Sequence, residues 1–128
     1  MKSFLDQYSD VAYLLMRVVL AFLLMSHGVQ RVFGGQAWPD FVLLGIANVI
    51  EVIVGPLIIL GLFTPYAAFI ASGEMAVAYF VAHHPRSMWP LLNMGEITVA
   101  LSFGFLYIAT QGGGRYSLDA VMGSGGKG

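Results

Sequence analysis

Ionisable side chains lie inside long apolar runs of this 128-residue chain, and they are Arg17, His27, Arg31, Glu51, Glu74 and Glu96. A charge at the centre of a bilayer costs at least about 2.5 to 3.5 kcal/mol, so such residues normally face other helices and find partners there. A buried histidine beside carboxylates can take up and release protons near neutral pH. The residue types therefore indicate proton transfer or polar-ligand binding within a membrane.

Helical rise sorts these residues by depth. Counting about 1.5 Å per residue from the face opposite the termini places His27, Glu51 and Glu96 roughly 9 to 14 Å below that face. The polar residues one helical turn nearer the face are Arg31, Asn48 and Asn93. We expect one cluster, in which His27, Glu51 and Glu96 carry the chemistry and the other three help to bind a ligand.

Two interpretations of this cluster stay open. It is either a structural polar network that fixes helix register or a site that binds a polar molecule.

Arg17 and Glu74 match each other in depth near the other face, so we expect a second buried pair, for which a structural role is the simpler interpretation. His83 and His84 precede Pro85 at a helix end, where they are either solvated interfacial residues or part of the mouth of the cluster.

Metal and haem are disfavoured. His27, Glu51 and Glu96 have acceptable ligand types for iron, manganese or zinc, but Arg31 close by opposes a cation. Nothing in the spacing sets His27 opposite His83 or His84 as a haem pair would require.

Composition identifies the class of protein. The chain is 58% hydrophobic and 10% charged, with a mean hydropathy of +0.78, whereas soluble domains carry roughly 25% charged residues. These values predict an integral membrane protein. A net charge of -1 without a basic block argues against nucleic acid binding, and the lack of cysteine excludes disulfides and thiol chemistry.

Four apolar segments approach the roughly 20 residues that a membrane crossing needs. We predict helices at about 11–33, 42–63, 66–82 and 90–110, forming a single domain that is an antiparallel four-transmembrane-helix bundle. Both termini then share one side, and the distribution of Lys and Arg favours the cytoplasmic side of a cell (inner) membrane. The tail predicts one short helix capped by Ser117 and a flexible end at about 120–128.

The second and fourth predicted helices share a short motif. "NVIE" contains Asn48 and Glu51, and "NMGE" contains Asn93 and Glu96. The chain is then two helical hairpins related by a parallel repeat, or the match is due to chance.

Several motifs in this order resemble the DoxX family of small four-helix membrane proteins. They are His27-Gly28 followed by a basic residue, Glu51 with Gly55, "LGLFT" at 60–64, Asn93 with Glu96, and "GGGRYSLD" at 112–119. The chain departs from the family pattern at Arg31, where lysine is commoner, at Pro65, where a basic residue is frequent, and at Gly113, where proline is frequent.

The resemblance implies a quinone-related function. Members of the family are described as membrane subunits of quinone-linked oxidoreductases and as partners of redox enzymes. A quinone would then bind at the polar cluster, and a protein partner would supply electrons, because the chain shows no flavin or iron-sulfur motif of its own. The alternatives are a small proton or solute carrier or channel, which could act as a homo-oligomer, and a membrane scaffold that anchors a soluble redox partner.

Overall fold

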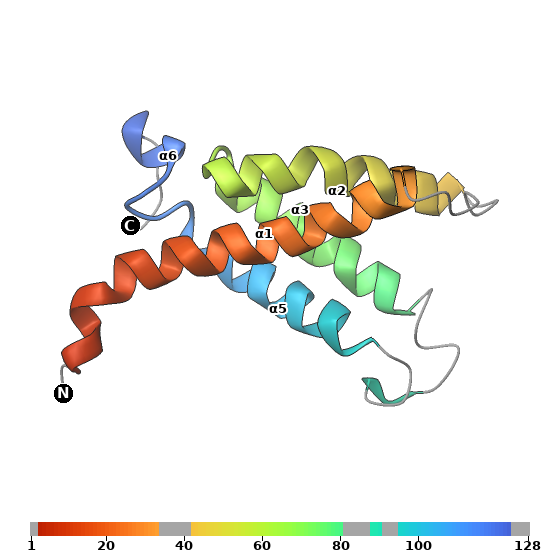
Figure 1. The fold of residues 1–128 in the computed structure, drawn as a ribbon, viewed down its shortest axis with the longest axis horizontal. Helices are drawn as coiled ribbons and strands as arrows, with labels where there is room; N and C mark the ends of the chain where they lie inside the picture. The colour runs from red at the N-terminus through yellow and green to blue at the C-terminus, as the bar shows by residue number, and fades with distance from the viewer. Residues whose placement is uncertain (1–2, 34–41, 81–87, 91–94, 124–128) are drawn as a thin grey trace.

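The computed structural model describes residues 3–33, 42–80, 88–90 and 95–123, and it omits the side chains of 30–32 and 42–44. Throughout this part of the chain the regular structure is helical and no strand occurs. The elements are the 3-10 helix η1 (Phe4–Tyr8) and the α-helices α1 (Ser9–Phe33), α2 (Val42–Leu60), α3 (Thr64–Ala78), α5 (Glu96–Gln111) and α6 (Leu118–Val121) (Figure 1).

The first two long helices pack against each other in opposite directions. Gly28 of α1 lies against Glu51 of α2, and Met25 lies against Gly55. At the other end, Arg17 hydrogen-bonds the carbonyl of Ile59. The residue number falls along α1 as it rises along α2, so the pair is antiparallel. Gly28 and Gly55 allow the two backbones to approach closely.

The other two long helices form a second antiparallel pair, α3 with α5 (Figure 1). Ser72 donates a hydrogen bond to the carbonyl of Ser102 at 2.7 Å, and Ser102 donates to the carbonyl of Ser72 at 3.0 Å. Such reciprocal bonds fix the register of two helices in an apolar setting. The shared core combines small and large residues from both pairs, namely Ala21, Leu24, Val54, Ile58, Ala67, Ala68, Ala71, Met75, Leu101, Phe105 and Ile108.

The outer surface of the long helices is apolar. Exposed large hydrophobic side chains occur on every one of them, including Phe22, Val49, Phe69 and Phe103. Apolar surface distributed in this way suits contact with lipid. Within the described residues, one segment is both long and apolar enough to cross a membrane by itself, Phe4–Val29, whereas the apolar stretch Gly45–Leu60 is shorter.

Local sequence explains where the helices begin and end. η1 precedes α1 because Ser3 and Asp6 form a capping box, and α1 begins at Ser9, two residues before the predicted start. α2 ends at Leu60 rather than at 63, because Gly61 adopts a positive φ of 71°. The N–H of Leu62 then bonds the carbonyl of Leu57, which is the 6→1 hydrogen bond of a Schellman motif.

The third and fourth predicted spans also differ from the observed helices. α3 covers Thr64–Ala78 instead of 66–82, of which residues 81 and 82 lie outside the described part. α5 covers Glu96–Gln111, whereas the predicted helix began at 90, and residues 91–94 lie outside the described part. In the tail, Ser117 accepts a hydrogen bond from the N–H of Ala120 at 3.1 Å and caps α6, which confirms the predicted short helix. Residues 124–128 of the predicted flexible end are not among those described.

Candidate functional site

Glu51 is the most completely buried acidic side chain among the described residues, with 0% exposure, and Asn48 one turn earlier on α2 is 1% exposed. Gly28 of α1 lies directly opposite. A Cβ atom at Gly28 would be 2.9 Å from Cβ and 3.1 Å from Oε2 of Glu51. The missing side chain at position 28 therefore makes the room in which the Glu51 carboxylate lies.

The other predicted members of this cluster have different environments. His27 is the sequence neighbour of Gly28 and is half-buried, so the α1 backbone beside it lies at the level of Glu51, as the depth argument predicted. Glu96 begins α5 and is exposed. A carboxylate in the first turn interacts favourably with the helix dipole. Of the two glutamates in the shared motif, the structure buries one and leaves the other exposed.

Four predicted ligand-binding residues cannot be placed. The side chain of Arg31, and the whole of Asn93, His83 and His84, lie outside the described residues. Their roles stay predictions. Within the described part, no three His, Asp or Glu side chains gather closely enough to hold a metal ion.

Arg17 is the centre of a second buried polar cluster. Its side chain is 2% exposed. The guanidinium donates to the carbonyls of Gly113, Ile59 (3.2 Å) and Tyr116 (2.8 Å). A planar guanidinium with five donors can serve several acceptors at once, which an ammonium cannot do in the same geometry. Arg17 thus ties α1 to the end of α2 and to the segment that follows α5.

These acceptors are not the partner that we predicted for Arg17. Glu74 lies on α3, where its side chain is half-buried and its carboxylate oxygens are buried. An ion pair between Arg17 and Glu74 stays a prediction. The hydrogen bonds described above join the guanidinium to backbone oxygens, which any residue type can provide and which a comparison of charged side chains does not reveal.

Asp119 completes the second cluster. Its carboxylate accepts hydrogen bonds from the N–H groups of Phe63 and Thr64, both at 2.9 Å. No side chain of the α2–α3 turn caps α3, so Asp119 supplies the cap from more than fifty residues away. Its own N–H donates to the carbonyl of Gly61 at 2.9 Å.

The electrostatics of Asp119 follow from these contacts. Burial raises the pKa of its carboxyl, but the hydrogen bonds from Thr64 and Phe63 and the charge of Arg17 together lower the pKa below its ordinary value. Asp119 also faces a strained backbone, since Phe63 has a φ of 50°, a conformation that bulky residues rarely adopt. The carboxylate therefore holds the start of α3 in place as an anion.

The sequence reasoning placed Asp119 in the "GGGRYSLD" motif but gave it no role. The sequence contains no signal for this role, because Thr64 before Pro65 is typical of an ordinary helix start, whereas the structure puts Phe63 in the capping position. The segment 112–119 packs tightly on this turn. A Cβ atom at Gly61 would lie 2.4 Å from Cβ of Ser117, and one at Gly113 would lie 2.8 Å from the same atom.

Comparisons with known proteins identify the family of the chain. The DoxX family model matches residues 12–84, which cover most of α1 and all of α2 and α3. The chain is also similar to an uncharacterized protein of Haemophilus influenzae, with 36% identity over 125 residues that cover 90% of this chain and 93% of the relative. No solved structure matches the chain. On this evidence the chain belongs to the DoxX family of membrane proteins.

Proposed function

We propose that this protein is the membrane subunit of a quinone-linked oxidoreductase and that its redox ligand binds beside Glu51. The observation that carries the proposal is a carboxylate with 0% exposure, set against a helix position that has no side chain. Burying an ionisable group is costly, and such groups in membrane helices commonly mark ligand sites or proton paths. The redox part of the proposal rests on the description of DoxX family members as subunits of quinone-linked oxidoreductases, and this chain belongs to that family.

The proposal includes four membrane crossings by α1, α2, α3 and α5. α2 has 19 residues and α5 has 16, which at about 1.5 Å per residue gives lengths of about 28 and 24 Å. These lengths approach the roughly 30 Å of a hydrocarbon core. The alternating directions of the four helices then put both ends of the chain on one side, which the distribution of Lys and Arg favours as the cytoplasmic side of the inner membrane.

The residue types predicted for this cluster suit a quinone headgroup. A quinone takes up two electrons and two protons as it becomes a quinol. Glu51 exchanges protons with a headgroup oxygen, His27 or Arg31 donates a hydrogen bond to the other oxygen, and Asn48 orients the carboxylate. Glu96, exposed at the start of α5, exchanges protons with solvent. The electrons come from a redox partner protein.

The test is the amount of quinone bound after purification in mild detergent, measured by solvent extraction and mass spectrometry. We expect quinone in about stoichiometric amount in the native protein and a loss of at least tenfold in Glu51→Gln. Asp6→Asn is the matched control, because it makes the same carboxylate-to-amide change in the exposed η1. Gly28→Ala provides a second variant that fills the space beside Glu51 without changing its charge.

Three results would contradict the proposal. They are equal retention by all variants, absence of quinone with no rebinding when it is added, and loss of quinone only in variants that also unfold. Proton or solute flux in liposomes that depends on both Glu51 and Glu74 would support a carrier instead. Loss of a captured soluble partner without any change in quinone would support a scaffold.

A further inference from the structure

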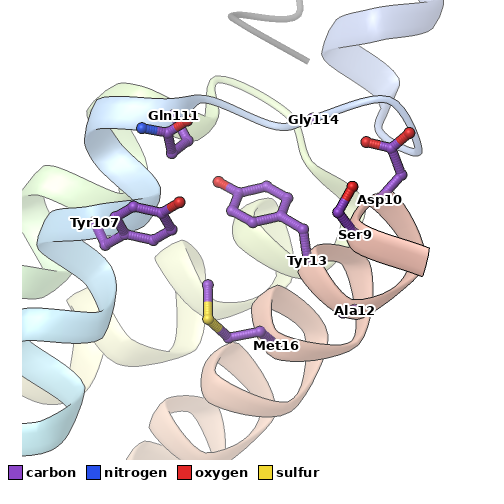
Figure 2. A pocket seen from close by; sticks show the side chains of 8 residues that line it. All are labelled: Ser9, Asp10, Ala12, Tyr13, Met16, Tyr107, Gln111 and Gly114. Carbon is purple, nitrogen blue, oxygen red and sulfur yellow. The ribbon is translucent and has the colours of Figure 1, made fainter. Parts of the chain in front are cut away.

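A pocket of about 400 Å³ lies between α1 and α5, at the end of the molecule that carries η1 and α6. Its lining residues are Ser9, Asp10, Ala12, Tyr13, Met16, Tyr107, Gln111 and Gly114. Figure 2 shows Tyr13 of α1 and Tyr107 of α5 lying across from each other, with Met16 beneath them. This pocket is separate from Glu51 of α2, which lies against Gly28 near the opposite end of α1.

The pocket has a polar end and an apolar end. Asp10 and Ser9 lie one turn nearer the start of α1 than Tyr13, and Gln111 is the last residue of α5. The tyrosine rings make an edge-to-face contact with centroids 6.4 Å apart, and Met16 lies one turn further along α1. If α5 crosses the membrane, as proposed above, the polar end is at the level of the lipid headgroups and the apolar end faces the acyl chains.

The charges at the polar end consist of one acid and one base. Asp10 is the one carboxylate among the lining residues, and Arg115 lies 3.7 Å from it, measured from Nη1 to Oδ2. Both side chains are substantially exposed. A pair that is this long and this exposed contributes little by itself and rearranges readily around a ligand.

We propose that this pocket binds a zwitterionic phospholipid with an ethanolamine headgroup. The ammonium group contacts Asp10 and donates hydrogen bonds to Ser9 and Gln111, while the phosphate contacts Arg115. The two opposite charges of the headgroup thus meet the two opposite charges of the protein. The rings of Tyr13 and Tyr107 contact the glycerol region of the lipid and the ammonium group. Met16 contacts the acyl chains.

A primary ammonium fits better than a quaternary one. The polar end offers carboxylate, hydroxyl and amide oxygens as acceptors, and a primary ammonium has three donors for them. A choline headgroup has no N–H group and could use only the aromatic faces. A glycerol phospholipid offers the same phosphate to Arg115, but its terminal glycerol is uncharged and provides no cation for Asp10.

Native mass spectrometry of the detergent-purified full chain, with equal amounts of ethanolamine, choline and glycerol phospholipids added, tests the proposal. We expect about tenfold preference for the ethanolamine lipid. Asp10→Asn should reduce the preference by about three- to tenfold, because it removes the partly exposed carboxylate that the ammonium contacts. Tyr107→Ala should weaken choline binding at least as much as ethanolamine binding, because choline can use only the aromatic faces. Arg115→Gln should weaken binding of all three lipids, since all three carry a phosphate.

Two matched controls keep the test specific. Asp6→Asn changes an acid in η1, and Tyr66→Ala removes an exposed tyrosine from α3 near the same end; neither residue lines the pocket. Both should leave the preference unchanged. Equal retention of the three lipids, or no effect of Asp10→Asn, would overturn the proposal. Full competition by soluble glycerophosphoethanolamine would overturn the lipid as the ligand and point to a free metabolite. None of these results depends on whether quinone binds at Glu51.

Discussion

The two ends of the helical pairs use buried charge in different ways. At the end with α6, Arg17 and Asp119 bind backbone groups of helix ends and of the segment after α5. At the other end, Glu51 lies opposite Gly28, where the facing helix contributes no side chain. Arg17 and Glu51 are almost equally buried, so burial alone does not separate a structural charge from a candidate site.

Removing the Arg17 guanidinium should have the largest effect on stability. Arg17→Ala leaves the carbonyls of Ile59, Gly113 and Tyr116 without their donor. We expect a loss of about 3 to 5 kcal/mol, because several hydrogen bonds to a charged donor are lost together, each of which contributes roughly 1.5 to 3 kcal/mol. Thermal unfolding in detergent, followed by circular dichroism, measures it. Arg17→Lys keeps the charge but not the fork of donors, so its melting temperature should lie between those of the native protein and Arg17→Ala. An unchanged melting temperature for both variants would contradict a structural role.

Gly61→Ala should destabilise the same end of the molecule by straining the backbone. The new Cβ atom would lie 2.4 Å from Cβ of Ser117, and φ is already 71°. We expect about 2 to 4 kcal/mol of destabilisation from the left-handed conformation and the overlap together. Limited proteolysis should show earlier cleavage between α5 and α6. Gly73→Ala is the control, because nothing lies within 4 Å of its added Cβ atom, and it should be neutral or slightly stabilising.

Asp119→Asn tests the cap on α3 and its dependence on pH. One of the two hydrogen bonds to Phe63 and Thr64 loses its acceptor, so we expect a loss of about 1 to 2 kcal/mol at pH 7. Because the folded pKa of Asp119 is lowered, its stabilisation is complete above the ordinary aspartate pKa of about 4 and is lost as pH falls through the folded value.

The measurement is the melting temperature of both proteins from pH 7 down to pH 3. The native protein should lose stability more steeply than the variant below about pH 4. Parallel curves would contradict the assignment of Asp119 as the titrating cap.

Gly28→Ala tests, at the other end of the molecule, whether Glu51 needs the space beside Gly28. Its Cβ atom would meet Cβ of Glu51 at 2.9 Å, so α1 and α2 must separate or the glutamate must turn. Overpacking of this kind costs about 1 to 3 kcal/mol, and quinone binding should fall by more than stability accounts for. Equal quinone content per folded protein would show that Glu51 needs no room beside Gly28.

Glu51→Gln should have the smallest effect on stability. An amide of the same shape is cheaper to bury than a carboxylate, so we expect a change of less than about 1 kcal/mol in either direction. Thermal unfolding measured beside quinone content separates the two roles. A loss as large as that of Arg17→Ala would assign Glu51 to the structural network.

Sequence reasoning predicted the helices well, because apolar run length and Gly or Pro breakers determine them locally. The Ser117 cap of α6 was predicted for the same reason. Helical rise put His27 and Glu51 at a similar depth, and the structure sets Gly28, the sequence neighbour of His27, against Glu51. Glu96 was placed by depth alone, and depth does not determine which way a side chain faces; the structure exposes it.

The role of Arg17 was out of reach for a different reason. Matching charged side chains to each other finds ion pairs, whereas the acceptors here are carbonyls of Ile59, Gly113 and Tyr116, which any residue type could provide. Asp119 was missed because its partners are the N–H groups of Phe63 and Thr64, more than fifty positions away. Contacts between a side chain and a distant backbone depend on the assembled fold.

The position of Arg17 also has a consequence for biosynthesis. The ribosome makes this residue early, in the first long helix, but two of its acceptors, at Gly113 and Tyr116, are made about a hundred residues later. At about 5 to 20 residues per second, the cation waits several seconds or more for them. Until they arrive, the guanidinium lacks two of its hydrogen-bond acceptors, so a chain that stops before residue 113 leaves this cation with its hydrogen bonds only partly made.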